Sequence, residues 1–111
     1  MHSPELLKGS LQTIILKLLA NNGRMYGYEI TQKVKELSDG SLIVSEGALY
    51  PTLHKLESEG LLTTEKISMG KRVRKYYTLT SNGKANVVER VKDFEAFIET
   101  MFKVLQISPQ L

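Results

Sequence analysis

The chain has 111 residues, of which 41% are apolar and 24% are charged, and its formal net charge is +3. This size and balance are typical of one globular domain, and no apolar run is long enough for a transmembrane helix. The sequence contains no cysteine and its first residues lack the regions of a signal peptide, so we expect a cytoplasmic protein without disulfides or thiolate metal sites.

The first half of the chain opens with two predicted helices. Apolar side chains between Leu7 and Leu19 recur at helical spacing and predict a helix over about residues 5–20. A second, shorter apolar stripe predicts a helix from about Gly27 to Ser38. The apolar residues 42–44 that follow are compatible with a short strand.

A third helix is predicted to begin after Ser45, which suits an N-cap, and to end before Gly60, which suits a left-handed position. Its apolar positions are Leu49, Leu53 and Leu56, so the opposite face is open to a partner. That face carries small residues, which let another surface approach closely, and polar side chains that suit bases or phosphates. We therefore predict DNA contacts from Ser45, Gly47, Ala48, Tyr50, Pro51, Thr52, His54 and Lys55.

Pro51 breaks a local rule in this helix. If Ser45 is the cap, Pro51 lies past the first turn and removes the backbone hydrogen bond to the carbonyl of Gly47. Departures from local rules tend to occur at functional sites, which favours a role in binding. A tolerated kink, or a helix that begins later, is the alternative.

A basic hairpin follows the third helix. The β-rich segments 61–67 and 73–79 are joined by a turn that contains Gly70, and one of the adjacent Tyr76 and Tyr77 is expected to pack inward. The twenty residues from 61 to 80 carry five Lys or Arg and one Glu. Their net charge of +4 is larger than the +3 of the whole chain. Phosphate contact is the favoured interpretation because the hairpin follows a candidate recognition helix, although charged strands also serve simply to prevent aggregation. The candidate phosphate-binding residues are Lys66, Lys71, Arg72, Arg74 and Lys75.

The final helix is predicted to begin after Thr80 and to reach about Leu105. Its apolar residues are spaced alternately four and three apart, which is the a and d pattern of a helical interface. One small chain can hardly bury them all, so a homodimer is the favoured interpretation and packing within one chain is the alternative. The predicted dimer interface comprises Val87, Val91, Phe94, Ile98, Met101 and Leu105.

Together these elements predict an α+β fold that is mostly α. Residues 1–79 form a winged helix-turn-helix of three helices and a two-stranded wing, and residues 80–111 form a long C-terminal dimerisation helix. A two-fold axis would present two recognition helices, as many DNA-binding dimers require.

The sequence resembles the PadR family of bacterial transcriptional regulators over nearly its whole length. Each shared motif is weak alone, and their combination is highly specific. The short chain with a single C-terminal helix is similar to the shorter branch of the family. The motifs are Met25-Tyr26-Gly27-Tyr28-Glu29-Ile30, Gly47-Ala48-Leu49-Tyr50-Pro51-Thr52-Leu53 with Lys55-Leu56-Glu57, Glu59-Gly60-Leu61-Leu62, and Arg74-Lys75-Tyr76-Tyr77-Thr78-Leu79-Thr80 with Gly83.

The resemblance implies a homodimeric winged-helix repressor that contacts a roughly palindromic operator in double-stranded DNA through the third helix and the wing. It also implies that the last helix makes the dimer. In some short members an aromatic ligand lies between the two last helices, and Phe94 falls at the corresponding place. Phe94 is therefore a possible ligand-pocket residue, with core packing as the alternative. Release of the DNA by a small-molecule or other effector at the dimer interface is expected.

Catalysis finds little support in the sequence. It has no P-loop, no Gly-x-Ser-x-Gly motif and no nucleotide-binding glycine motif. Its two histidines, His2 and His54, lack a second ligand at helical spacing. We therefore expect no enzymatic activity, no cofactor and no metal. Two alternatives to a regulator stay open: a winged-helix module that binds an acidic protein, and a ligand-binding dimer without operator specificity.

Overall fold

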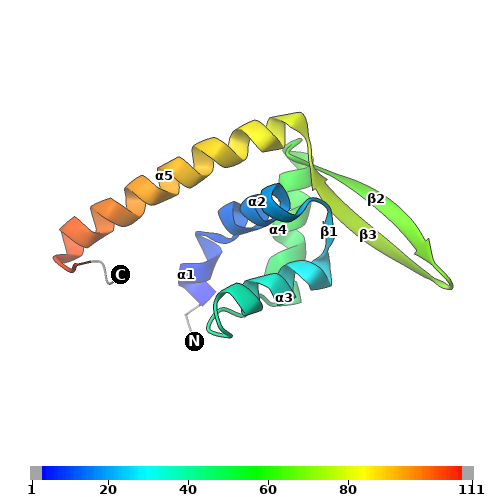
Figure 1. The fold of residues 1–111 in the computed structure, drawn as a ribbon, viewed down its shortest axis with the longest axis horizontal. Coiled ribbons are helices and arrows are strands. Elements are labelled where there is room, and N and C mark those ends of the chain that lie inside the picture. Colours follow the sequence, from blue (N-terminus) through cyan, green and yellow to red (C-terminus); the bar gives the residue numbers. More distant parts are fainter. Residues whose placement is uncertain (1–3, 109–111) are drawn as a thin grey trace.

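The computed structural model describes residues 4–108. In this part of the chain the fold is mostly helical with a small antiparallel sheet and a long last helix, which confirms the predicted fold class (Figure 1). The elements are α1 (Pro4–Lys8), α2 (Leu11–Asn22), β1 (Met25–Tyr26), α3 (Gly27–Leu37), α4 (Glu46–Ser58), β2 (Leu62–Met69), β3 (Arg72–Leu79) and α5 (Ser81–Leu105).

The predicted first helix is in fact two helices, because the chain turns at Gly9 and Ser10 between α1 and α2. The backbone N–H of Ser10 donates to the carbonyl of Leu7 at 3.0 Å, and the Ser10 hydroxyl donates to the same carbonyl at 3.1 Å. Leu7 and Leu11 on the two sides of the turn are both buried. The apolar spacing thus continues through the turn, which is why the sequence pattern did not reveal it.

The sheet has three strands in the order β1-β3-β2, all antiparallel. The hairpin strands β2 and β3 were predicted, and β1 is an additional strand at the edge of the sheet. Met25 and Tyr26 of β1 pair with Tyr77 and Tyr76 of β3. The expected strand at residues 42–44 is wrong, since this segment lies outside the sheet. The wing is therefore joined to the helical body through the residues that lead directly into α3.

The core lies between α2, α3, α4 and the base of the sheet. Tyr77 is the member of the tyrosine pair that packs inward, and it is 1% exposed. The three predicted inward positions of α4 are also buried. The largest fully buried side chains are Tyr77, Ile15, Leu16, Ile30, Leu49, Leu53 and Leu56.

Both ends of α4 follow the predicted signals. The Ser45 side chain accepts a hydrogen bond from the backbone N–H of Ala48 at 3.2 Å. At the other end Gly60 takes a φ of +77°, and the N–H of Leu61 donates to the carbonyl of Leu56 at 3.0 Å. This Schellman arrangement ends the helix and directs the chain into β2.

Helix α5 begins against the base of the wing and then leaves the body. The Thr80 side chain caps it by accepting from the N–H of Gly83 at 3.0 Å, as predicted. Its first half packs on α2, where Arg90 donates to the side-chain oxygen of Gln12 at 2.6 Å. Its second half extends past α1 without another element beside it (Figure 1). Among the described residues no helix is long and apolar enough to cross a membrane.

Candidate nucleic-acid interface and dimerisation helix

The outer face of α4 is open to solvent, opposite its three buried leucines. Gly47, Pro51, His54 and Lys55 on this face are all exposed. The helix runs without interruption from Glu46, so Pro51 lies in its second turn and the alternative of a later start is excluded. Because proline has no N–H, the carbonyl of Gly47 is left without its helical donor on an accessible face.

Besides Ser45, which caps the helix, two of the predicted contacts on α4 are already engaged within the protein. The Thr52 hydroxyl donates to the carbonyl of Ala48 at 2.8 Å. The ring of Tyr50 packs over Gly27 at the start of α3, where an added Cβ would lie 2.5 Å from the Tyr50 hydroxyl oxygen. Tyr50 remains 38% exposed, so it joins the two helices and still presents an edge to solvent. Gly27 thus has a steric role that its motif did not reveal.

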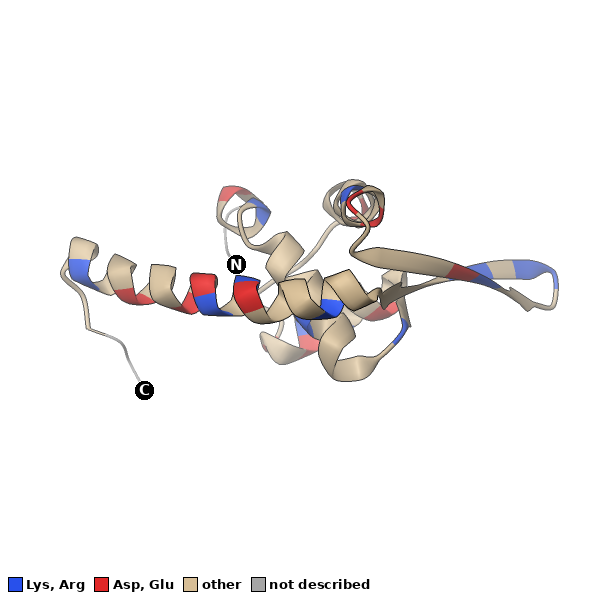
Figure 2. Ribbon diagram, turned by 90° about the horizontal axis from the view of Figure 1, so that it is seen from above, with Lys and Arg blue, Asp and Glu red and all other residues tan. Residues whose placement is uncertain are grey.

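The five basic residues of the hairpin occupy two different settings. Lys71 and Arg72 are exposed at the far end of the wing, where Lys and Arg gather in Figure 2, and Lys66 is exposed midway along β2, opposite Lys75. Lys75 lies near the base, 3.9 Å from a carboxylate oxygen of Glu57 on α4. Arg74 lies on the other face of the sheet with its guanidinium over a tyrosine ring. The far end of the wing is therefore the part best placed to contact a polyanion.

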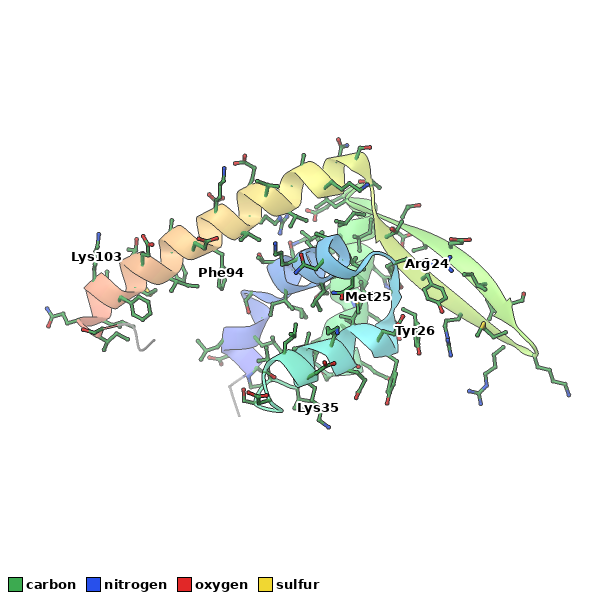
Figure 3. All side chains as sticks on the ribbon, in the orientation of Figure 1. Arg24, Met25, Tyr26, Lys35, Phe94 and Lys103 are labelled. Carbon is green, nitrogen blue, oxygen red and sulfur yellow. The ribbon has the colours of Figure 1, made fainter. Side chains whose placement is uncertain are left out.

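An arginine–tyrosine cluster at the base of the wing was not predicted. The guanidinium of Arg74 lies 4.0 Å from the ring centre of Tyr26, and that of Arg24 lies 4.8 Å from the ring centre of Tyr76. The two rings meet edge-on with centroids 5.4 Å apart. A hydrogen bond with Tyr76 is the main cause that raises the pKa of Arg74 above its ordinary value. Figure 3 shows Arg24 and Tyr26 beside the strands of the wing.

No local pattern in the sequence identifies this cluster. Tyr26 belongs to a strand of two residues, Met25–Tyr26, which is too short to show a period, and Arg24 directly precedes it. The partners of Arg24 and Tyr26 in the cluster lie about fifty positions later. The available signal was the presence of Tyr26, Arg74 and Tyr76 in two of the shared motifs. The motifs identify these residues but do not show which side chains they contact.

The six residues of the predicted dimer interface differ in exposure along α5. Val87 is only 4% exposed and belongs to the core of its own chain, so it has little surface left for a partner. Val91, Phe94 and Met101 are partly buried. Ile98 and Leu105 are exposed, as are four further apolar side chains on or just after the helix: Val88, Phe97, Val104 and Ile107.

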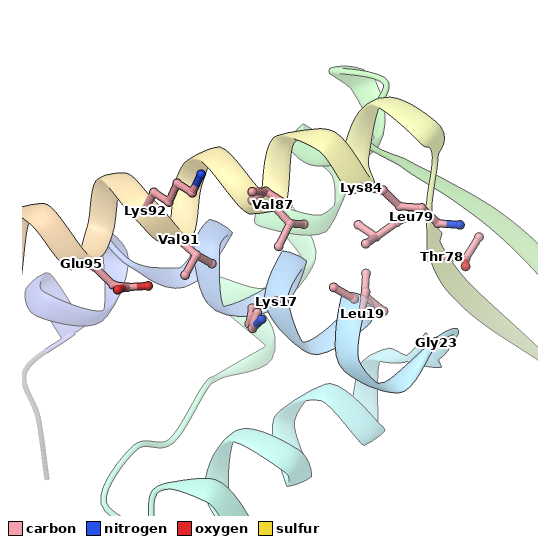
Figure 4. A pocket seen from close by; sticks show the side chains of 12 residues that line it. Lys17, Leu19, Gly23, Thr78, Leu79, Lys84, Val87, Val91, Lys92 and Glu95 are labelled. Carbon is pink, nitrogen blue, oxygen red and sulfur yellow. The ribbon is translucent and has the colours of Figure 1, made fainter.

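A groove of about 580 Å³ lies between α2, the end of β3 and the first half of α5 (Figure 4). Its apolar lining includes Leu19, Val87 and Val91, and Lys84 and Lys92 are among its polar residues. Phe94 does not line it but lies on the neighbouring side of α5, at two smaller hollows of about 270 and 540 Å³. Its ring is 6.5 Å from that of Phe97, centre to centre.

The described residues contain no cluster of His, Cys, Asp or Glu that could hold a metal ion. His54 is an exposed residue of the outer face of α4, and His2 lies outside the described residues.

Known transcriptional regulators are similar to this chain in sequence and in fold. The transcriptional regulator Rv3488 of Mycobacterium tuberculosis is 39% identical over 85 residues, covering 77% of this chain and 76% of that protein. A transcriptional regulator from Clostridium thermocellum has a similar structure, with a TM-score of 0.82 at 27% identity over 93% of this chain and 97% of that one.

A DNA complex is among the similar structures. Bacillus subtilis PadR, solved with operator DNA, matches 73% of this chain at 34% identity with a TM-score of 0.66, and this chain covers 46% of it. Residues 15–89 match the Transcriptional regulator PadR-like family. The chain therefore belongs to the PadR-like family of DNA-binding transcriptional regulators, which are not enzymes.

Proposed function

We propose that this protein represses transcription by binding operator DNA as a homodimer, with α4 in the major groove and the wing on the adjacent backbone. The observation that carries the proposal is that the chain exposes both the basic far end of the wing and the outer face of α4. The similar PadR structure with operator DNA supports the same partner here. Phosphate contacts by the wing would position the protein, and base contacts by α4 would give sequence preference.

The homodimer rests on the second half of α5. Phe97 is 56% exposed and Leu105 is 60% exposed in the single chain, on a helix that projects from the body. Contiguous apolar surface of this kind marks an interaction site in a soluble domain. A second copy is the partner that also supplies a second α4, so that the dimer matches a palindromic site.

A small-molecule effector is the third part of the proposal. The hollows beside Phe94 lie where α5 meets α2, on the helix that we assign to the dimer. A ligand there would release DNA only if it bound the DNA-free arrangement of the two subunits more tightly than the DNA-bound one. Titration of planar aromatic compounds against the protein–DNA complex tests this part; if none shifts DNA affinity, constitutive repression remains.

The main experiment is selection of bound duplexes from a random pool with the purified protein at about physiological salt. Enrichment of an inverted repeat with half-sites about one helical turn apart is expected for a sequence-specific dimer. The same sequence placed over a promoter should then lower transcription when the protein is present. Salt-sensitive binding without any enriched sequence would contradict operator recognition and favour a module that binds an acidic protein.

A further inference from the structure

The arginine–tyrosine cluster at the base of the wing joins three segments of the chain. The guanidinium of Arg24 lies over Tyr76, Tyr76 meets Tyr26 edge-on, and Tyr26 lies under the guanidinium of Arg74. Arg24 also forms an ion pair with Glu65 on β2 at 3.2 Å. We call these four residues, Arg24, Tyr26, Arg74 and Tyr76, the arginine–tyrosine stack.

The register of the sheet explains why the four side chains meet. Side chains alternate between the faces of a strand, so Arg74 and Tyr76 share one face of β3 and Lys75 and Tyr77 share the other. Tyr26 is the partner of Tyr76 across β1 and β3. The stack therefore covers the face of the sheet opposite Tyr77, which packs into the core.

The base of the wing needs such support because few backbone bonds connect it to the body. Strand β1 pairs with β3 at only two positions, Met25 with Tyr77 and Tyr26 with Tyr76. Beyond them β2 and β3 pair only with each other out to Met69 and Arg72. A small tilt at Tyr76 would thus move the basic end of the wing through a much larger distance.

The two faces of the base are held by different contacts. On the α4 side, Glu57 accepts a hydrogen bond from Thr64 at 3.3 Å and lies 3.9 Å from the Lys75 ammonium group. On the other side, the stack and the Arg24–Glu65 pair are the side-chain ion pairs and ring contacts that join residues 24–26 to the hairpin within residues 4–108. Removing the stack would leave the wing braced from one side.

We propose that Tyr26 and Arg24, which belong neither to the recognition helix nor to the wing, are positioning residues for DNA binding: with Tyr76 and Arg74 they fix the angle of the wing relative to α3 and α4. This inference rests on the proposed function. It also gives Arg74 a different role from Arg72, since the flat face of its guanidinium is occupied by a ring. A lysine keeps the charge of arginine but cannot reproduce this planar stacking.

The first test compares Tyr26→Leu with Tyr26→Phe on a duplex selected by the wild-type protein. Tyr26→Phe keeps the ring and should bind like the wild type. Tyr26→Leu removes the ring contacts without changing any charge, so we expect about tenfold weaker binding. The slope of affinity against salt should stay the same, because the number of neutralised phosphates is unchanged.

The second test uses two arginines two positions apart on the same face of β3. Within residues 4–108 Arg72 contacts no aromatic ring, whereas Arg74 stacks on Tyr26. Both Arg74→Lys and Arg72→Lys keep their positive charge. We expect Arg74→Lys to weaken DNA binding several-fold more than Arg72→Lys. Equal losses would mean that Arg74 acts only as a charge, and would overturn the inference.

Hydrogen exchange of the free protein provides a readout that needs no DNA. In Tyr26→Leu the hairpin amides of residues 64–68 and 73–77 should exchange faster, while those of α2 and α4 stay protected. If Tyr26→Leu proves too unstable to study, Arg74→Lys is measured in the same way. Unchanged hairpin exchange together with unchanged affinity would overturn the inference. Failure of the wild-type protein to select any duplex would instead count against the proposed function, and the exchange data would still decide whether the stack braces the wing.

Discussion

Two arms leave the body of this protein in different directions, and their exposed side chains differ in kind. The far end of the hairpin exposes cations such as Lys71 and Arg72. The far half of α5 exposes apolar side chains such as Phe97 and Ile98, between charges of both signs (Figure 2). Both arms project from the body in the single chain, but the chemistry of their exposed side chains suits different partners.

The comparison shows that the exposure of a side chain indicates a kind of partner only when the residue type is considered with it. Cations gain free energy by neutralising phosphates and releasing counterions, so contacts of the hairpin arm should weaken steeply as salt rises. Apolar groups gain by leaving water, so contacts of the α5 arm should depend little on salt. Separate measurements of DNA binding and of association can therefore assign each arm to its partner.

The largest expected effect is on stability, at the place where the start of α5 packs against the start of the hairpin. A Cβ at Gly83 in α5 would lie 2.1 Å from the backbone carbonyl oxygen of Leu61, just before β2. Because backbone atoms cannot move aside cheaply, Gly83→Ala should lower the free energy of unfolding by about 3 kcal/mol. Gly9→Ala is the matched control, since a Cβ there meets nothing within 4 Å. Thermal unfolding of both variants checks the prediction, and equal stability would contradict it.

A charge placed on the α5 arm alone should separate association from folding. Ile98→Glu puts a carboxylate where we expect the partner subunit, and it should raise the dimer dissociation constant at least ~100-fold. The hairpin and core should stay folded because Ile98 is 39% exposed in the single chain. Sedimentation measures the change, with Ile98→Leu as the apolar control. A wild-type monomer, or an Ile98→Glu variant that still dimerises, would reject this assignment of α5.

A smaller effect is expected from single charges on the hairpin arm. Lys71→Gln or Arg72→Gln should each lower the slope of log affinity against log salt by about one unit. Lys75→Gln should change it less, because this ammonium group already lies 3.9 Å from the Glu57 carboxylate. Binding titrations at several salt concentrations measure the slopes. Equal slopes for all three variants would mean that position along the wing does not matter.

The smallest effect concerns the body rather than either arm. Burial, helped by the nearby Glu57 and Tyr50, raises the pKa of Tyr77 above its usual value of 10.0. The folded protein therefore keeps this proton when the unfolded chain has lost it, so Tyr77 stabilises the fold fully below pH 10 and less as pH rises further. Tyr77→Phe should flatten the fall in stability above pH 10. Denaturant unfolding between pH 8 and pH 11 tests this, and parallel pH curves would refute it.

The parts of the fold that were predictable follow local rules. The caps Ser45 and Thr80, the left-handed Gly60 and the buried leucines of α4 all depend on residues within one or two turns of each other. The turn between α1 and α2 was not predicted, because Leu7 and Leu11 keep helical spacing on its two sides. A local pattern cannot show a change of direction that leaves its spacing intact.

The candidate site was predictable as a set of residue types but not as a set of contacts. The sequence identifies the basic hairpin and the open face of α4. It cannot show that Arg74 stacks on Tyr26, or that Tyr50 packs over Gly27, because these pairs are separated by 48 and 23 positions. Such pairs form only when the sheet register and the packing of α3 on α4 are fixed. The heptad spacing also placed Val87 in the predicted interface, because spacing along α5 cannot show that residues of the same chain already cover this side chain.

The hairpin is closed at its root independently of its far end. The backbone N–H of Thr80 donates to the carbonyl of Leu61 at 3.0 Å, and its hydroxyl donates to the carbonyl of Gly60 at 2.7 Å. Among residues 4–108, Arg74 makes the outermost ring or charge contact between the hairpin and the body. Residue pairs added beyond Arg74 would therefore leave these contacts in place. Each added pair would lengthen the wing by about 3.4 Å. Insertions and deletions around Gly70 thus give evolution a way to alter the reach of the protein along a duplex while its core and its partner surface stay the same.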